Sequence, residues 1–318
     1  AGLFAKIAST GVITNLALKN VSINGQFKTA GGFAGINEGT ITRSEVVSGS
    51  VTSTLQDAST GAICGINKYS VANYGRIDRC YSNISVSGIT YVGGLTGTNN
   101  GGIVINSYVK LDADNKITSI LAGSNVGGLI GFSKDSARIL ESFVNLSVYA
   151  KSENKINGGL IGYLLINDSY SFNISNSYSE VIGNDSMGGL IGSVVGYRIN
   201  IYEENSVQKV EFTHNSSFNN LYLDYCYSVS FYQNSNTEEV IYRPIINKYD
   251  FSIKNFETCF YLGSENISNF GVNKTLEELQ NILTYKEVGF DITERAFGSD
   301  ATWFIYTGVI NNSLPYLS

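Results

Sequence analysis

The side chains of this sequence that could carry out catalysis are few, and their spacing does not bring them together. The chain has one histidine, His214, which lies in a polar stretch. A Ser-His-Asp triad or a histidine-rich zinc site would have to be built around that single residue. We therefore expect His214 to be a solvated loop residue.

Carboxylates are the other candidate catalytic groups, because paired carboxylates perform glycoside hydrolysis. In this chain the aspartates fall at unrelated positions of a repeat of about thirty residues. Those that fall within the repeats include Asp78, Asp112, Asp114, Asp135, Asp168 and Asp185. Such scatter is typical of a solvated surface.

One short motif resembles the start of a calcium-binding loop. Asp112-Ala113-Asp114-Asn115 places oxygen ligands on alternate residues, but the glycine and the distal glutamate that complete such a loop are missing. A turn between two coils explains the motif equally well. The sequence thus predicts no catalytic, cofactor-binding or metal-binding residues and no cofactor.

A recurring glycine box indicates which structural elements would position such a site. Close copies of Gly-Gly-Leu-Ile-Gly stand at 93–97, 127–131, 158–162 and 188–192, and looser copies at 2–6, 31–35 and 61–65. The closing glycines fall at 35, 65, 97, 131, 162 and 192, so the steps are 30 to 34 residues. A constant period of this length indicates a repeat architecture.

Each repeat also has an anchor, in which a small polar residue precedes an aromatic residue, as in Ser107-Tyr108 and Ser177-Tyr178. Apolar and polar residues alternate around it, which indicates strands. Coils of two or three short strands bury their apolar faces only when they stack. We predict an all-β parallel β-helix, or β-solenoid, of about eight coils. Glycine pairs are expected at its corners, where positive φ is tolerated.

The rest of the chain departs from this pattern. Residues 193–256 lack the glycine box and are expected to continue the coils, with protruding loops at 215–220 and 233–239. Near the end, Thr275-Leu276-Glu277-Glu278 has capping-box spacing and begins an apolar stripe, which predicts a short helix. The stripe consists of Leu276, Leu279, Ile282 and Leu283. The predicted division is a regular solenoid over 1–192, irregular coils over 193–269 and a C-terminal cap over 270–318.

Composition narrows the class of protein. The net charge is −6 over 318 residues and only 15% of residues are charged, while glycine is abundant and proline nearly absent. Without a basic run there is no electrostatic footprint for nucleic acid. No apolar run is long enough to span a membrane. These features favour an extracellular or cell-surface β-protein.

Tyrosine is frequent, with 21 copies, and could form a ligand-binding face. Tyr81, Tyr108 and Tyr178 share one phase of the repeat, so a stacked structural ladder is the expected role for them. The better candidates for a binding face lie in the irregular region. They are Tyr197, Tyr202, Tyr222, Tyr225, Tyr227 and Tyr232.

The four cysteines allow a geometric prediction. Cys226 and Cys259 each precede an aromatic residue and should occupy one column of neighbouring coils, about 4.8 Å apart, within reach of a disulfide. Parallel side chains fit the bond's torsion poorly, so bridged and free forms both remain open. Cys64 and Cys80 are expected to be free and buried.

The glycine box followed by the Asn-Ser-Tyr anchor resembles the GLUG repeat of secreted and surface-attached proteins of bacteria and some protists. The ending, with Cys259-Phe260-Tyr261, a Thr-Leu-Glu-Glu-Leu helix, Trp303 and a final Leu-Pro-Tyr-Leu, also resembles the close of such arrays. The resemblance covers about two thirds of the chain. It implies a repeat fold and an extracellular setting, and it carries no catalytic residues.

Two functions from different classes are consistent with these observations. The first is a non-catalytic structural or adhesive surface protein, whose partner is itself end to end, a cell-surface protein or a glycan. The alternative is a carbohydrate-active β-helix enzyme, or the accessory repeat segment of a surface protease. An open β-edge is expected at the first coil, where Gly2-Leu3-Phe4 begins within a repeat.

Overall fold

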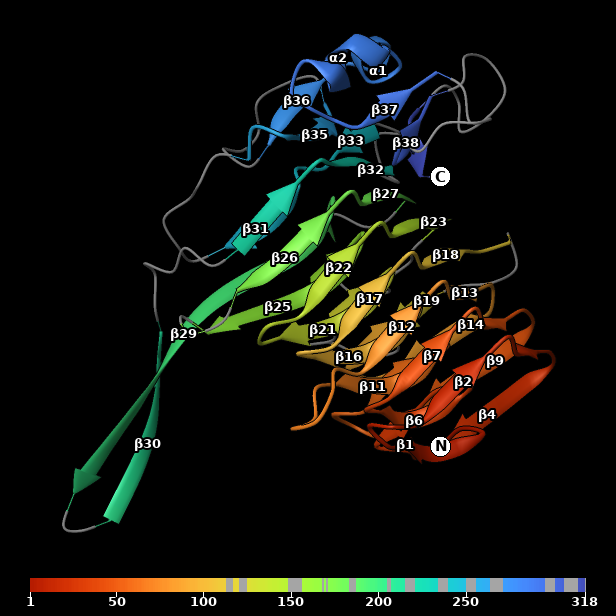
Figure 1. Ribbon diagram of the computed structural model, residues 1–318, viewed down its shortest axis with the longest axis vertical. Coiled ribbons are helices and arrows are strands. Elements are labelled where there is room, and N and C mark those ends of the chain that lie inside the picture. Colours follow the sequence, from red (N-terminus) through yellow and green to blue (C-terminus); the bar gives the residue numbers. More distant parts are fainter. Residues whose placement is uncertain are drawn as a thin grey trace.

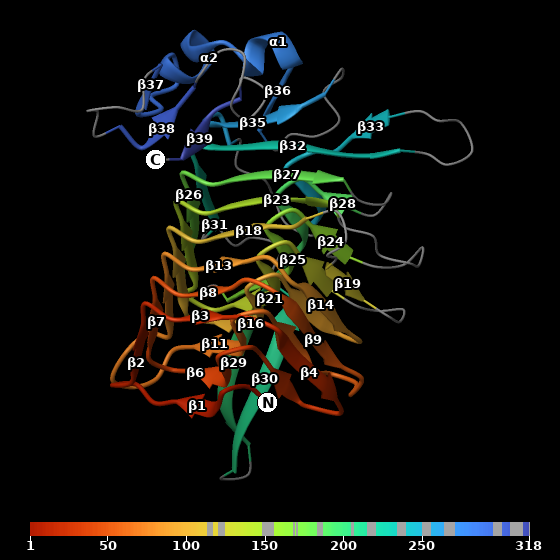
Figure 2. The same ribbon diagram turned by 90° about the vertical axis from the view of Figure 1, so that its right-hand side faces the viewer.

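The computed structural model describes residues 1–112, 117–119, 125–147, 156–167, 169, 171–182, 187–204, 207–214, 221–233, 240–249, 256–263, 271–294, 301–305 and 314–317. Over these residues the chain winds into stacked parallel coils, with the N-terminus at one end of the stack and two short helices at the other (Figures 1 and 2). The predicted all-β solenoid is confirmed.

A regular coil contributes one short strand to each of five parallel sheets. The sheets are numbered in chain order, and sheet 1 contains the strand that ends where the glycine box begins. Sheet 1 holds β5 (Thr29–Ala30), β10 (Ser59–Gly61), β15 (Tyr91–Gly93), β20 (Asn125–Gly127), β24 (Ile156–Gly158) and β28 (Met187–Gly188). Sheet 2 holds β1 (Phe4–Ile7), β6 (Ala34–Asn37), β11 (Cys64–Lys68), β16 (Thr96–Asn100), β21 (Ile130–Lys134), β25 (Ile161–Asn167), β29 (Ile191–Glu204) and β34 (Ile246–Tyr249). Sheet 3 holds β2 (Val12–Thr14), β7 (Thr40–Thr42), β12 (Arg76–Asp78), β17 (Ile103–Ile105), β22 (Arg138–Leu140), β26 (Phe172–Ser175) and β31 (Leu221–Asp224).

Two further sheets complete the coil. Sheet 4 holds β3 (Ala17–Leu18), β8 (Glu45–Val46), β13 (Tyr81–Ser82), β18 (Tyr108–Lys110), β23 (Phe143–Ser147), β27 (Tyr178–Ile182), β32 (Cys226–Gln233), β35 (Cys259–Leu262) and β36 (Val272–Lys274). Sheet 5 holds β4 (Val21–Gly25), β9 (Gly49–Ser53), β14 (Ser85–Gly88) and β19 (Ile117–Ser119). Over the described residues the stack has about six regular turns. The expected eight is reached only by counting the less regular coils at both ends, which bring sheet 2 to eight parallel strands.

The glycine box is explained by the close approach of neighbouring coils. The Gly128 amide donates to the Gly159 carbonyl at 3.1 Å, and a Cβ on Gly128 would lie 2.6 Å from Val144 Cγ1. Leu129 and Ile130, which follow, are fully buried. Apart from Gly2 in the first copy, with a φ of 154°, the box glycines do not adopt positive φ, so that part of the prediction is wrong for the other copies. They are needed because a side chain would collide with the next coil.

Positive φ occurs instead at the corner before sheet 4, in a column of residues that carry side chains. Its members are Asn15, Arg43, Arg79, Asn106, Glu141, Asn176 and Tyr225, with φ between 47° and 55°. The left-handed region costs a non-glycine residue roughly 1 kcal/mol. Six of these amides donate to a carbonyl of the next coil, as Arg43 does to Asp78 at 3.0 Å, and the Tyr225 amide donates to the Thr258 hydroxyl at 3.4 Å. These hydrogen bonds offset the cost.

Polar side chains inside the stack also form a ladder. Asn37, Asn67 and Asn99 are fully buried and occupy one column of sheet 2. Asn37 Nδ2 donates to Asn67 Oδ1 at 2.8 Å, and Asn67 Nδ2 donates to Asn99 Oδ1 at 3.0 Å. Asn99 Nδ2 ends the ladder on the Gly102 carbonyl at 3.1 Å. Buried amides are tolerated because each side-chain amide has a hydrogen-bond partner.

The expected aromatic ladder is confirmed on sheet 4. Rings of Tyr81, Tyr108, Phe143, Tyr178 and Tyr227 follow one another at 4.7 to 4.9 Å. From Tyr108 onward their planes differ by no more than 4°. The ring spacing equals the strand spacing of about 4.8 Å, so the ladder follows directly from in-register stacking.

The irregular region continues the coils and adds two antiparallel hairpins. β31, β32 and β34 pair with the strands of the preceding coil, as expected. β29 runs beyond its coil and pairs with β30 (Val207–His214) in a hairpin that projects from the stack (Figure 1). β32 pairs with β33 (Val240–Tyr242) in the second. The loops expected at 215–220 and 234–239 lie outside the described residues, and Gln233 ends β32.

The cap contains two helices rather than one. Thr275 and Glu278 form the predicted capping box at the start of α1 (Leu276–Leu279), and Asn281 caps α2 (Ile282–Lys286). Because the helix is interrupted there, Leu276 and Leu283 are exposed, and the expected continuous apolar stripe is wrong. A small sheet of β37 (Ile292–Thr293), β38 (Trp303–Phe304) and β39 (Tyr316–Leu317) completes the cap.

The first coil is the other end of the stack. Pairing of Phe4 with Ala34 places residues 1–5 on the box at 31–35, so the first box begins one residue earlier than the sequence suggested. Over the described residues, β1 to β4 each pair with a strand of the second coil and with no other. Leu3, Phe4, Val12 and Leu16 are exposed there. Among the described residues there is no helix long and apolar enough to cross a membrane.

Candidate functional site

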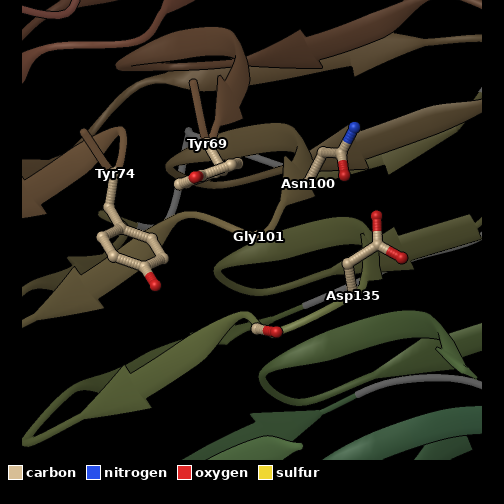
Figure 3. A pocket seen from close by; sticks show the side chains of 6 residues that line it. Tyr69, Tyr74, Asn100, Gly101 and Asp135 are labelled. Atoms are coloured by element: carbon tan, nitrogen blue, oxygen red, sulfur yellow. The ribbon is translucent and has the colours of Figure 1, made fainter. Parts of the chain in front are cut away.

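The strongest candidate site is a cavity of about 370 Å³ at the corner between sheets 2 and 3. It is lined by Tyr69, Tyr74, Asn100, Gly101, Asp135 and Ser136, which come from three successive coils. Figure 3 shows the two tyrosine rings on one side and the Asn100 and Asp135 side chains on the other. This arrangement combines aromatic surface with polar groups.

The cavity exists because one coil carries an insertion at this corner. Seven residues, 69–75, connect β11 to β12, whereas two connect β16 to β17 and three connect β21 to β22. The longer connection projects from the surface, and Val71 within it is 97% exposed. It therefore forms a wall beside the shorter turns of the next two coils.

Hydrogen bonds hold the inserted turn in one shape. The Ser70 amide donates to the Asn73 carbonyl at 2.8 Å, and the Asn73 amide donates back at 3.1 Å. Asn73 Nδ2 reaches the Ser9 carbonyl of the first coil at 3.2 Å. The Tyr69 amide donates to the Asn100 carbonyl at 2.8 Å, which ties the turn to the next coil. The tyrosines are thus fixed relative to Asn100.

The cavity has unused hydrogen-bonding capacity. Within the part of the chain that the structure describes, the hydroxyls of Tyr69, Tyr74 and Ser136 and the side-chain amide of Asn100 have no hydrogen-bond partner. The two tyrosines are 49% and 42% exposed, and their ring centroids lie 5.1 Å apart. These groups can bind a ligand that offers both apolar surface and hydroxyl groups.

Charge at this corner is largely neutralised by neighbouring residues. Lys134 Nζ lies 3.8 Å from Asp135 Oδ2. Lys68, beside the inserted turn, contacts Glu38 at 2.9 Å, and Lys6 contacts the same carboxylate at 2.8 Å. Hydrogen bonds from Lys6 and then Lys68 hold the pKa of Glu38 below its usual range. The positive charges of Lys6, Lys68 and Lys134 are thus each offset by a neighbouring carboxylate.

Two other cavities lie along the aromatic ladder. One, of about 390 Å³, is bordered by Arg43, Arg79, Tyr81 and Tyr108, and the other, of about 300 Å³, lies between Tyr108 and the cap. Burial raises the pKa of Tyr81 and Tyr108. Because these rings stack on one another, they present edges rather than faces. They are less suited to holding a ligand than Tyr69 and Tyr74.

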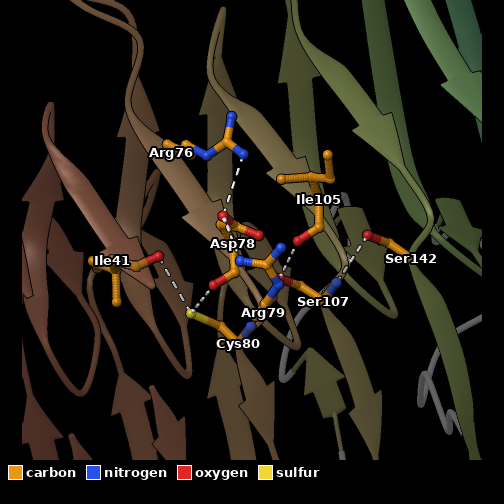
Figure 4. Close-up of polar contacts among 8 residues, drawn as sticks. All are labelled: Ile41, Arg76, Asp78, Arg79, Cys80, Ile105, Ser107 and Ser142. Atoms are coloured by element: carbon orange, nitrogen blue, oxygen red, sulfur yellow. Dashed lines mark hydrogen bonds and ion pairs between the residues drawn. The ribbon is translucent and has the colours of Figure 1, made fainter. Parts of the chain in front are cut away.

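Of the scattered aspartates, the structure describes Asp78, Asp112 and Asp135, and each of these has its own partner. Asp78 lies 3.2 Å from Arg76 and 3.8 Å from Arg79 on sheet 3 (Figure 4). Asp112 bonds to the Asn83 side chain at 2.7 Å. The rest of the calcium-like motif, residues 113–115, and Asp168 and Asp185 lie outside the described residues. In the described part of the chain, no group of three His, Cys, Asp or Glu side chains could hold a metal ion.

Several residues differ from their expected setting. His214 ends β30 instead of lying in a loop. Tyr227 is fully buried in the ladder, so it cannot form a binding face, and the partly buried Tyr225 packs edge-on against Phe290. Tyr222 is 41% exposed on β31. The side chains of Tyr197, Tyr202 and Tyr232 lie outside the described residues.

Sequence reasoning did not single out Tyr69 and Tyr74. The available signal was the spacing: seven residues separate two strands that the other regular coils join with two to four. Departures from a repeat are more informative about function than its constant positions, because constant positions are explained by stacking.

A second column, of small polar residues, explains the cysteines. Ser107 Oγ accepts from the Cys80 amide at 3.0 Å, and Ser142 Oγ accepts from the Ser107 amide at 3.2 Å (Figure 4). Cys80 takes a serine's place here, and its Sγ donates to the Ile41 carbonyl at 3.4 Å. Cys226 Sγ likewise donates to the Asp224 carbonyl at 3.2 Å. The predicted shared column of Cys226 and Cys259 is confirmed, and both are free thiols.

We expect all four cysteines to resist alkylation in the native protein. All are buried, and burial raises the pKa of Cys64 and Cys80 to about 12 and that of Cys226 well above its usual range. The thiolate is the reactive form, so iodoacetamide at pH 8 should leave the folded protein unmodified. After unfolding without reductant, intact mass should show four modified thiols. Two modified thiols would instead demonstrate a Cys226 to Cys259 bridge.

Comparison of the chain with protein-family models, with curated proteins and with solved structures finds no match.

Proposed function

We propose that this protein is a non-catalytic, extracellular β-solenoid with a structural or adhesive role, in which the stack displays a ligand-binding corner. The observation that carries the proposal is the contrast between the columns and the inserted turn. Column residues such as Asn67 and Ser107 bond to neighbouring coils. Tyr69 and Tyr74 instead present rings and hydroxyls outward.

The placement of the aspartates that the structure describes supports binding over catalysis. Asp78 ends a strand of sheet 3, Asp112 follows sheet 4 and Asp135 follows sheet 2. Glycoside hydrolysis needs two carboxyl groups within about 5 to 10 Å across one substrate bond. The resemblance of the boxes and anchors to GLUG repeats, together with the low content of charged residues, supports an extracellular setting.

Incubation of the purified protein with a panel of polysaccharides and peptides tests this proposal. Product release, followed by reducing-end and amine assays, should not exceed that of a heat-denatured control. Turnover that is lost in Asp78→Asn or Asp135→Asn would contradict the proposal and favour the enzyme alternative.

A further inference from the structure

The cavity beside the inserted turn has the chemistry of a sugar-binding site. A pyranose ring has apolar C–H faces that pack on aromatic rings, and hydroxyls that need donors and acceptors around its rim. Tyr69 and Tyr74 supply the rings, while Asn100, Asp135 and Ser136 supply polar groups from the next two coils. We propose that this cavity binds a neutral saccharide, an inference that gives the ligand class for the binding corner of the proposed function.

The size of the cavity suits a small ligand. Its volume of about 370 Å³ lies at the lower end of the roughly 300–1,000 Å³ that small-molecule sites occupy. One sugar ring fits beside the tyrosines, and further units of a glycan can extend along the surface. Val71, at the tip of the same turn, is available to contact them because it is 97% exposed.

Charge decides between neutral and acidic sugars. Among the described residues that line the cavity, Asp135 is the one carboxylate and none is basic. The nearest ammonium groups, Lys134 and Lys68, contact Asp135 and Glu38. The Lys134 ammonium is already paired with Asp135, so the described lining offers an acidic sugar no cation of its own, whereas the hydroxyls of a neutral sugar can donate to the Asp135 carboxylate.

The site is also pre-organised. The turn is closed by the Ser70 to Asn73 pair and tied to the first coil through Asn73. Gly101 adopts a φ of 67°, and a Cβ there would lie 3.2 Å from Tyr69 Cβ, so glycine leaves room for that ring. Groups held in place before binding lose little conformational entropy on binding. The insertion therefore builds a fixed wall.

Saturation-transfer NMR on the full chain tests the site. The probes are glucose, galactose, mannose, N-acetylglucosamine and, as an acidic comparison, sialyllactose. At least one neutral probe should receive saturation on its ring protons. Tyr69→Ala and Tyr74→Ala should each weaken that binding by roughly tenfold, since truncated aromatic anchors commonly cost this much. Asp135→Asn, which keeps the side-chain shape, should weaken it less.

Two matched variants separate loss of the site from loss of the fold. Leu283→Ala removes an exposed large side chain, 58%, on α2 in the cap and should bind like the wild type. Replacing residues 69–75 by Gly-Gly, the connection found at 101–102, should remove binding while the thermal unfolding midpoint is retained.

Each outcome decides the inference. Binding of no neutral probe, binding that survives the 69–75 replacement, or a preference for sialyllactose would overturn it. A neutral sugar that binds at Tyr69 and is also cleaved would support the site and overturn the non-catalytic proposal. Absence of both binding and turnover would overturn the site alone.

Discussion

Trp303→Ala is expected to lower the free energy of unfolding by about 4 kcal/mol, the typical cost of truncating a fully buried large aromatic residue. Trp303 has no exposed surface and lies 5.8 Å from the Tyr178 ring, 5.7 Å from Tyr227 and 5.5 Å from Phe290. Its Nε1 donates to Asn176 Oδ1 at 3.1 Å. The residue joins the cap to the ladder, so its loss should loosen both. Urea unfolding followed by circular dichroism measures the effect.

Trp303→Phe is the matched control for this variant. It keeps an aromatic ring against Tyr178 and Tyr227 and removes the bond to Asn176, so a smaller loss of roughly 1–2 kcal/mol is expected. If Trp303→Ala unfolds at the wild-type urea concentration, the cap is not packed on the ladder as described.

Gly128→Ala is expected to destabilise the stack by about 2 kcal/mol. Alanine in place of glycine ordinarily stabilises by about 0.4–1 kcal/mol through the unfolded state. Overpacking of a closed site costs about 1–3 kcal/mol and occasionally more. A Cβ on Gly128 would press on the Gly159 carbonyl and lie 2.6 Å from Val144 Cγ1. Neither neighbour is the end of a flexible side chain, so the overpacking cost exceeds the gain.

Gly32→Ala provides the comparison at the same box position of another coil. Its Cβ would lie 2.7 Å from the Ala62 carbonyl and 3.2 Å from Val46 Cγ2, which is less crowded. The next coil already carries Ala62 at this position. The urea midpoint of Gly32→Ala should therefore fall less than that of Gly128→Ala. The reverse order would contradict the steric account.

The repeat period and strand pattern were sufficient to predict the stack, its register and the aromatic ladder. Tyr81, Tyr108 and Tyr178 recur at one phase, and in-register stacking alone then places their rings together. The capping box of α1 was also readable, because Thr275 and Glu278 interact locally. These features depend on position in the repeat or on near neighbours in sequence.

Other features depended on contacts that sequence does not show. The conformational freedom of glycine predicts positive φ at the box glycines. In the structure, positive φ occurs mainly at residues such as Arg43 and Arg79, whose backbone amides donate to carbonyls of the next coil. The interruption between α1 and α2 depends on the Asn281 cap. The candidate site joins Tyr69, Asn100 and Asp135 from three coils, so only the insertion at 69–75 was visible in the sequence.

The central claim is that the coils stack in register, so that equivalent side chains bond from coil to coil. The buried asparagine ladder tests it most directly, because the side-chain amides of Asn37 and Asn67 can donate to Asn67 and Asn99 only in that register. Hydrogen exchange of these amides, measured by NMR on labelled protein, gives the answer. Slow exchange at Asn37 and Asn67, beside fast exchange at the exposed Asn24, is the predicted result. Exchange at Asn67 as fast as at Asn24 would contradict the account.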